Sequence, residues 1–389
     1  MLAAAAMTTL GSVPVFLLSA QSVLIRQELH FGEAALGLAV SAFFGAAALA
    51  SVATGTFIEG FGRRRGTVLA GGLALVSASA IALGARSYVV LLVMLVVAGV
   101  ANAALQMTAN LSLARSVSPG RQGLAFGVKQ SAVPVAILVG GLAVPTVGVA
   151  VGWRWTFGAI AVAGAVVVVA GLRMARTGPG VRADRPIPDR PPRGALVVSF
   201  VAMTLASGGL NSLGAFLPAW AFHVGLSPGN AGLLMAAGSA LSVLARVLSG
   251  ARADRRRGRN LPVVSSYLAL GAVGVVVLSL GTIPTLIAGA LVAFALGWAW
   301  PGLLLFAVVR VGRDSPATAS GAVQAGAFAG GAAGPVLFGL LVAATDYPTA
   351  WRLAAAMLVG AAALLLVARR MFLRDLVQRP PRRPLDTAR

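Results

Sequence analysis

Long apolar runs separated by short polar segments dominate the chain. The runs cover about residues 6–25, 34–57, 66–85, 88–113, 121–148, 155–174, 195–222, 229–250, 261–281, 284–309, 317–343 and 350–369. A helix needs about 20 apolar residues to cross the hydrocarbon core of a bilayer. The pattern therefore predicts an all-α membrane protein with twelve transmembrane helices. The first run lacks the basic segment of a signal peptide, so we interpret it as an uncleaved span, with cleavage as the alternative.

The composition supports this class of protein. Of the 389 residues, 58% are hydrophobic and 11% are charged, which excludes an ordinary soluble globule. The formal net charge of +21 would suit nucleic acid, but basic residues beside apolar spans follow from the positive-inside rule. We therefore expect a lipid bilayer as the partner and no nucleic acid. With no cysteine and only two histidines, we expect no metal and no cofactor.

The basic residues are divided unequally between the two sides of the predicted bundle. If the amino terminus is cytoplasmic, the outer loops carry only Arg26, Arg86, Arg154 and Arg352, and the loops and tail on the inside carry most of the other arginines. This asymmetry predicts a multi-pass protein of the cell (plasma) membrane with both termini in the cytoplasm.

The chain divides into two similar parts. Residues 177–194 are rich in proline and arginine and cannot bury a core. We expect an N-terminal six-helix bundle at 1–174, a cytoplasmic linker at 175–194, a C-terminal six-helix bundle at 195–370 and a basic cytoplasmic tail at 371–389. At a constant offset of 198 residues, Gly99, Arg115, Gly123, Trp153 and Arg154 match Gly297, Arg313, Gly321, Trp351 and Arg352. Parallel repeats of this kind are typical of secondary transporters.

Two short segments carry related loop motifs. The first contains Gly55, Glu59, Gly62, Arg63 and Arg64, and the second contains Gly250, Asp254, Arg255, Gly258 and Arg259. Their order resembles the G-x-x-x-D-R-x-G-R-R motif of the major facilitator superfamily (MFS), although Glu59 replaces the aspartate and Gly60 the first arginine. The resemblance implies the MFS fold of two pseudo-symmetric bundles, transport by alternating access, and a conformational latch at these residues. The alternative is that the arginines only set the topology.

Lys129, the only lysine of the chain, is the main candidate for binding a solute. Counted from Gly123, its Cα lies about 9 Å inside the fifth span, where a lysine costs about 2.5–3.5 kcal/mol to insert. Every acidic residue falls in a loop, a tail or a helix end. We therefore predict that an anionic solute pairs with Lys129. The alternative is that its long stem only reaches back to the interface.

Other polar and aromatic residues of the spans complete the predicted binding set. Asn102, Gln106 and Asn110 follow one stripe of the fourth span, where they either line a cavity or join helices by hydrogen bonds. The remaining candidates are Gln21, Gln130, Asn211, Trp298, Trp300 and Gln324. Arg246 lies one turn before the second loop motif, so we expect it to extend toward the cytoplasmic interface.

These observations predict a secondary active or facilitative transporter that moves a small solute, an organic anion, across the cell membrane. An efflux pump for lipophilic drugs is the first alternative, and a non-transporting receptor or scaffold is the second. A co-transported proton would ride on the cargo or on Lys129, and we expect a monomer. The sequence contains no nucleophile elbow, paired catalytic carboxylates, zinc spacing or phosphate loop, so we do not predict an enzyme.

Overall fold

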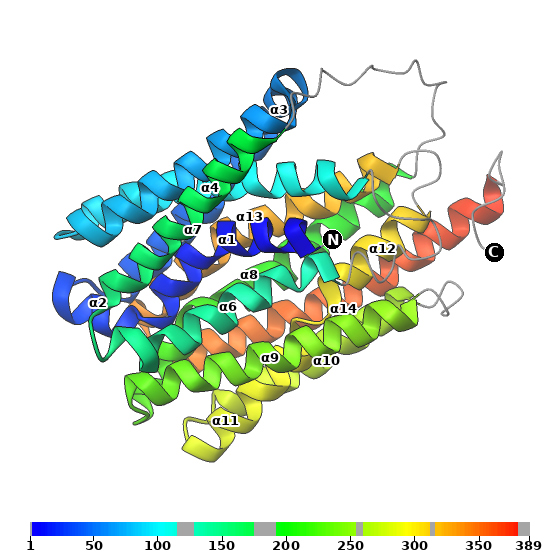
Figure 1. The fold of residues 1–389 in the computed structure, drawn as a ribbon. Helices are drawn as coiled ribbons and strands as arrows, with labels where there is room; N and C mark the ends of the chain where they lie inside the picture. Colours follow the sequence, from blue (N-terminus) through cyan, green and yellow to red (C-terminus); the bar gives the residue numbers. More distant parts are fainter. Residues whose placement is uncertain (1, 115–127, 175–191, 254–259, 312–315, 380–389) are drawn as a thin grey trace.

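The computed structural model describes residues 2–114, 128–174, 192–253, 260–311 and 316–379, apart from the side chains of 2, 52–63, 110–114, 309–311, 316–320 and 322. Within these ranges the chain forms helices and no strands (Figure 1). Twelve stretches are long and apolar enough to cross a membrane. The predicted all-α fold with twelve spans is confirmed.

The half of the chain before residue 175, here called the N-terminal half, contains the first six spans. Its elements are α1 (Leu2–Ala20), α2 (Ser22–Leu29), α3 (Glu33–Gly84), α4 (Tyr88–Ala114), α6 (Ala132–Ala143), the π-helix η2 (Val144–Gly148) and α7 (Trp153–Arg173). Helix α3 carries both the second and the third span. The backbone between them is helical where we expected a loop. No proline interrupts residues 52–63, so every amide there can join a helical hydrogen bond.

The half after residue 191, the C-terminal half, contains the other six spans. Its elements are α8 (Arg193–His223), α9 (Pro228–Ala253), α10 (Asn260–Leu278), α11 (Ile283–Val292), the π-helix η3 (Ala293–Gly297), α12 (Trp300–Val311), α13 (Pro316–Ala344) and α14 (Tyr347–Gln378). Gly225 and Gly281 have φ values of 113° and 74° in the tight connections after α8 and α10. Glycine adopts such values without steric cost.

The helix ends define two sides of the bundle. The terminal side holds the ends of α7 and α9 and the beginnings of α8 and α10. The opposite side holds the short connections at 21–32, 85–87, 149–152, 224–227, 279–282 and 345–346. In Figure 1 the terminal side is on the right, with the red end of α14, and the opposite side is on the left, with α2 and α11.

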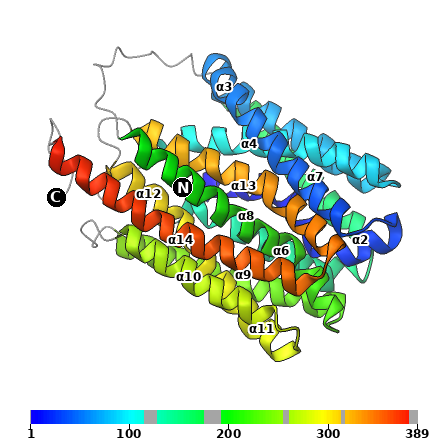
Figure 2. The same ribbon diagram turned by 180° about the vertical axis from the view of Figure 1, so that it is seen from behind.

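Two helix pairs make the most extensive contacts between the halves, and both pairs pack closely near the opposite side. In the first pair, Gly37 of α3 packs against the carbonyl of Pro335 in α13, and the Ser41 hydroxyl accepts a 3.0 Å hydrogen bond from the amide of Val336. In the second, a Cβ at Gly141 of α6 would lie 2.5 Å from the carbonyl oxygen of Gly232 in α9. Small residues allow such close approach of membrane helices. Helices α3 and α13 separate toward the terminal side (Figures 1 and 2), so the described state is closed at the opposite side.

Candidate functional site

A buried arginine lies between the two halves. Arg246 of α9 is 2% exposed and lies about 10 Å from the α9 end at Ala253, at about 1.5 Å per residue. Its Nε donates a 2.7 Å hydrogen bond to the carbonyl of Trp298, and its Nη1 donates to the carbonyl of Gln130. The expectation that Arg246 extends to the interface is therefore wrong. The two carbonyls hold the guanidinium inside the protein instead.

Both carbonyls are available because helices are interrupted beside them. In a continuous helix the Gln130 carbonyl would accept from the amide of residue 134, but Pro134 has no N–H. Trp298 follows η3 with φ −95° and ψ 0°, outside regular helical geometry. At membrane depth such carbonyls need partners from the protein. Arg246 thus satisfies one interruption in each half.

Aromatic side chains surround the guanidinium. Its central carbon lies 5.6 Å from the centre of the Trp298 ring, within the range of a cation–π interaction. Phe294 stacks on Trp298 at 6.2 Å, and Phe16 of α1 meets it edge-on at 6.3 Å. The Trp298 indole N–H and the Arg246 Nη2 group are buried without a partner in the described protein. A buried donor left unpaired costs about 1–3 kcal/mol.

Lys129 directly precedes the residue whose carbonyl binds this arginine. Because it directly precedes Gln130, its backbone is next to the guanidinium. The side chain is half-buried and makes no hydrogen bond or ion pair with the described protein. The described acidic residues, namely Glu28, Glu33, Asp346 and Asp375, all lie outside the membrane interior, in connections or near helix ends. The backbone that follows Lys129 therefore contacts Arg246, and no described carboxylate pairs with either cation.

The amides of the fourth span join helices. Asn102 is buried, and its Oδ1 accepts from Gln106 Nε2 at 3.3 Å and from the Ser12 hydroxyl of α1 at 3.4 Å. These bonds connect α4 to α1, which favours the helix-joining interpretation for this pair. The side chain of Asn110 lies outside the described residues.

The other predicted binding residues are dispersed. Gln21 is buried near the opposite side, where its Nε2 donates to the Thr156 hydroxyl at 2.8 Å. Asn211 donates to a carbonyl four residues earlier in its own helix. Trp300 is buried with its indole N–H unpaired in the described protein, and Gln324 is half-buried in α13. Of the predicted set, only Gln130 and Trp298 contact the buried arginine in the described protein, and Lys129 directly precedes Gln130.

The latch remains a prediction. The described part of the chain leaves out the side chains of Glu59 and Arg63 and all of Asp254, Arg255, Gly258 and Arg259. Gly55 and Gly62 are described only as backbone of α3. Within the described part, Arg64 is half-buried in α3 and Gly250 is buried near the end of α9.

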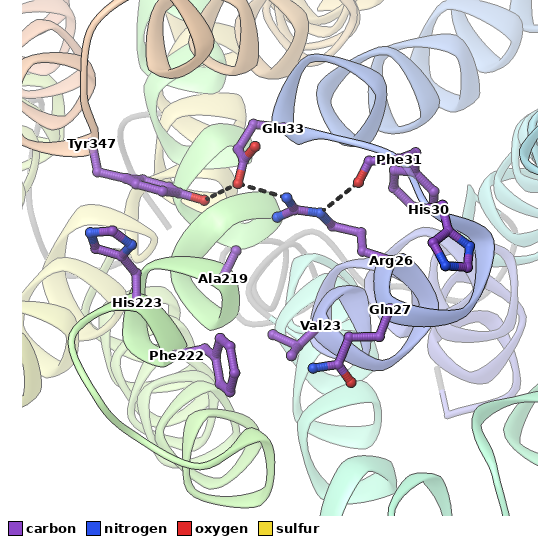
Figure 3. A pocket seen from close by; sticks show the side chains of 10 residues that line it. All are labelled: Val23, Arg26, Gln27, His30, Phe31, Glu33, Ala219, Phe222, His223 and Tyr347. Atoms are coloured by element: carbon purple, nitrogen blue, oxygen red, sulfur yellow. Dashed lines mark hydrogen bonds and ion pairs between the residues drawn. The ribbon is translucent and has the colours of Figure 1, made fainter.

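A cavity of about 550 Å³, which was not predicted from the sequence, lies at the opposite side (Figure 3). In it the Glu33 carboxylate pairs with Arg26 at 2.7 Å and accepts from the Tyr347 hydroxyl at 3.3 Å. Glu33 therefore links the N-terminal half to α14. Both histidines of the chain, His30 and His223, line the cavity. Their presence in two predicted loops was the only sign of this site in the sequence.

The family follows from the sequence as a whole. The chain matches the model of the Major Facilitator Superfamily over residues 1–324 and over residues 199–388. It belongs to this superfamily. The chain is thus an MFS transporter, embedded in the membrane by multiple spans. A chloramphenicol resistance protein of Streptomyces lividans is 30% identical to it over 300 residues, which cover 72% of each chain.

Solved structures show the same fold. A bacterial homologue of the human lysosomal transporter Spinster, in an inward-facing and unoccupied conformation, is 16% identical with a TM-score of 0.71, covering 96% of this chain and 97% of its own. A D-xylose–proton symporter is 14% identical with a TM-score of 0.77, covering 94% and 96%. At these identities the likeness concerns the fold alone.

Proposed function

We propose that this MFS transporter carries a small organic anion across the cell membrane by alternating access. The observation that supports the proposal is the contact of Arg246 with the residue after Lys129, where neither cation has a described carboxylate as partner. Membrane-embedded charges usually mark a substrate or ion pathway. An anionic cargo would form an ion pair in a partly desolvated site, where removing one partner costs about 2–5 kcal/mol.

In this proposal the terminal side faces the cytoplasm. The arginine asymmetry supports the orientation, since basic loops are retained inside. The described state is then closed toward the outside through the α3–α13 and α6–α9 contacts. Rocking of a 1–174 bundle against a 195–370 bundle would open that side, with the 175–194 linker cytoplasmic. Labelling of an Ala183→Cys variant by an impermeant thiol reagent from outside intact cells would overturn the orientation.

Efflux of lipophilic compounds is the second candidate. The relative named for chloramphenicol resistance favours it, and the aromatic group of Phe16, Phe294 and Trp298 offers an apolar contact surface. An uncharged cargo would not need Lys129. This difference separates the two candidates.

The decisive test is a thermal-shift and binding screen of small carboxylates, cations and uncharged compounds that include chloramphenicol. We expect carboxylates to stabilise the parent and Lys129→Gln to weaken their binding roughly thirty-fold or more. Arg173→Gln is the matched control, because it removes one positive charge from an exposed position at the end of α7. Uncharged ligands that bind parent and Lys129→Gln equally would favour the second candidate. Uptake of the stabilising ligand into proteoliposomes distinguishes a carrier from a receptor.

A further inference from the structure

Arg246 connects the two halves at the centre of the protein. It belongs to α9, and its Nη1 donates to a carbonyl of the N-terminal half while its Nε donates to Trp298 of its own half. We propose that Arg246 is a specificity-determining residue. Its guanidinium leaves the Gln130 carbonyl to bind the oxyanion of the cargo, and this breaks its hydrogen bond between α9 and the N-terminal half. The inference rests on the proposed function and assigns the cargo to planar oxyanions such as carboxylates.

The link to Gln130 depends on Pro134. Since residue 134 lacks an N–H, no amide of its own helix competes for the Gln130 carbonyl. The next residue resumes the helical pattern, because the amide of Val135 donates to the carbonyl of Ser131 at 3.0 Å. The interruption is therefore a single missing bond. Arg246 supplies that bond across the interface between the halves.

A carboxylate is a better acceptor for this guanidinium than the carbonyl. The Gln130 carbonyl takes only Nη1, and Nη2 stays buried without a partner in the described protein. A carboxylate accepts both N–H groups in parallel and carries a full charge, and such charge-assisted bonds are roughly twice as strong as neutral ones. The Trp298 carbonyl can keep Nε throughout, so the guanidinium needs only to turn about that bond. Lys129, on the chain next to Gln130, adds a second positive charge.

Pro134→Ala tests the link without changing Arg246 or Lys129. The restored amide competes for the Gln130 carbonyl, so the empty carrier should lose part of the contact between α9 and the N-terminal half. We expect the ratio of separated to joined halves to rise by about two- to tenfold, the worth of one net hydrogen bond. Double electron–electron resonance between labels at Leu172→Cys and Ala251→Cys, both exposed at the terminal side, measures it. Pro14→Ala, the same change within α1, should leave the ratio unchanged.

Arg246→Lys tests the oxyanion preference. Lysine keeps the charge and lacks the planar fork, so we expect carboxylate binding to weaken about tenfold or more, with chloride binding unchanged. If anion binding depends on Lys129 but Pro134→Ala does not change the ratio of separated to joined halves, this inference is overturned and the proposed function stays intact. If no anion binds the parent, the proposed function fails and the cargo assignment fails with it, even where Pro134→Ala shifts the halves.

Discussion

The contact of α3 with α13 gives a direct test of which state the structure represents. A Cβ at Gly37 would meet the Pro335 carbonyl oxygen more closely than real atoms approach, and it would lie 3.0 Å from the carbonyl carbon and 3.1 Å from the Cα of Val336. These neighbours are backbone atoms of α13, which cannot rotate away. Gly37→Ala should therefore push the two helices apart at the opposite side.

The expected size of this effect follows from overpacking. Inserting one methyl group into a close-packed contact costs about 1–3 kcal/mol, which changes the ratio of two conformations by about 5- to 150-fold. This free-energy cost applies only to the described state, in which the two helices touch. The state that opens toward the opposite side separates them and avoids the cost. Resonance distances between labels at Ser87→Cys and Ala344→Cys, both exposed on that side, should lengthen. The cysteine-free chain makes these two labels unique.

Gly45→Ala is the matched control on the same helix. A Cβ there would lie 3.9 Å from the Cβ of Ala332, an ordinary van der Waals distance. We expect parent-like distances for this variant and similar melting temperatures for both variants in detergent. Equal distance distributions for Gly37→Ala and the parent would refute the interpretation of this contact. Equal shifts in both variants would refute it as well, because helix propensity would then be the cause.

Two further predictions concern the connections at the opposite side. Burial tends to raise the pKa of Glu28, but its bonds to Arg154 and Trp153 prevail and hold the pKa below the ordinary 4.5. This stabilisation is present above about pH 4.5 and is lost as pH falls through the lowered pKa. Glu28→Gln should therefore lower the free energy of unfolding at pH 7 by about 1 kcal/mol or less, because the carboxylate is half exposed. The melting temperature should fall accordingly at pH 7, and its difference from the parent should vanish in acid. Asp346 caps α14 by accepting from the Thr349 amide at 2.7 Å, which lowers the Asp346 pKa. Melting curves should show a loss for Asp346→Ala and little loss for Asp346→Asn, since asparagine keeps the cap.

The spans could be predicted because the bilayer reduces the problem to length and hydrophobicity. Each backbone group must be satisfied within the membrane, so every long apolar run becomes a helix. The boundary within α3 was harder to predict. The arginines at 63–65 predict that this segment lies in water outside the bilayer, whereas the backbone stays helical there. Charge predicts where a segment lies and not whether its backbone is regular.

The candidate site was predicted in part. Lys129 was proposed because a lone lysine in an apolar run is conspicuous, and Trp298 because it lies close to Trp300, the counterpart of Asn102 at the repeat offset. Arg246 was misplaced because its distance from the helix end suits an extended side chain as well as a buried one. The missing information was tertiary. Only the structure shows that the carbonyls freed at Pro134 and Trp298 meet at the same point in space.

The way Arg246 is held also bears on how the cargo would bind. Two carbonyl bonds and one ring offset part of the desolvation of the guanidinium, while Nη2 and the Trp298 indole N–H stay unpaired in the described protein. Folding has then already removed water from donors that an oxyanion needs, so binding has less water left to displace. If the guanidinium were fully paired within the protein, an arriving anion would gain no hydrogen bond. If the guanidinium were fully hydrated, each binding event would have to overcome its desolvation free energy. Partial pairing lets a carboxylate compete with a carbonyl, and this competition is what a transporter needs in order to bind its cargo and then release it.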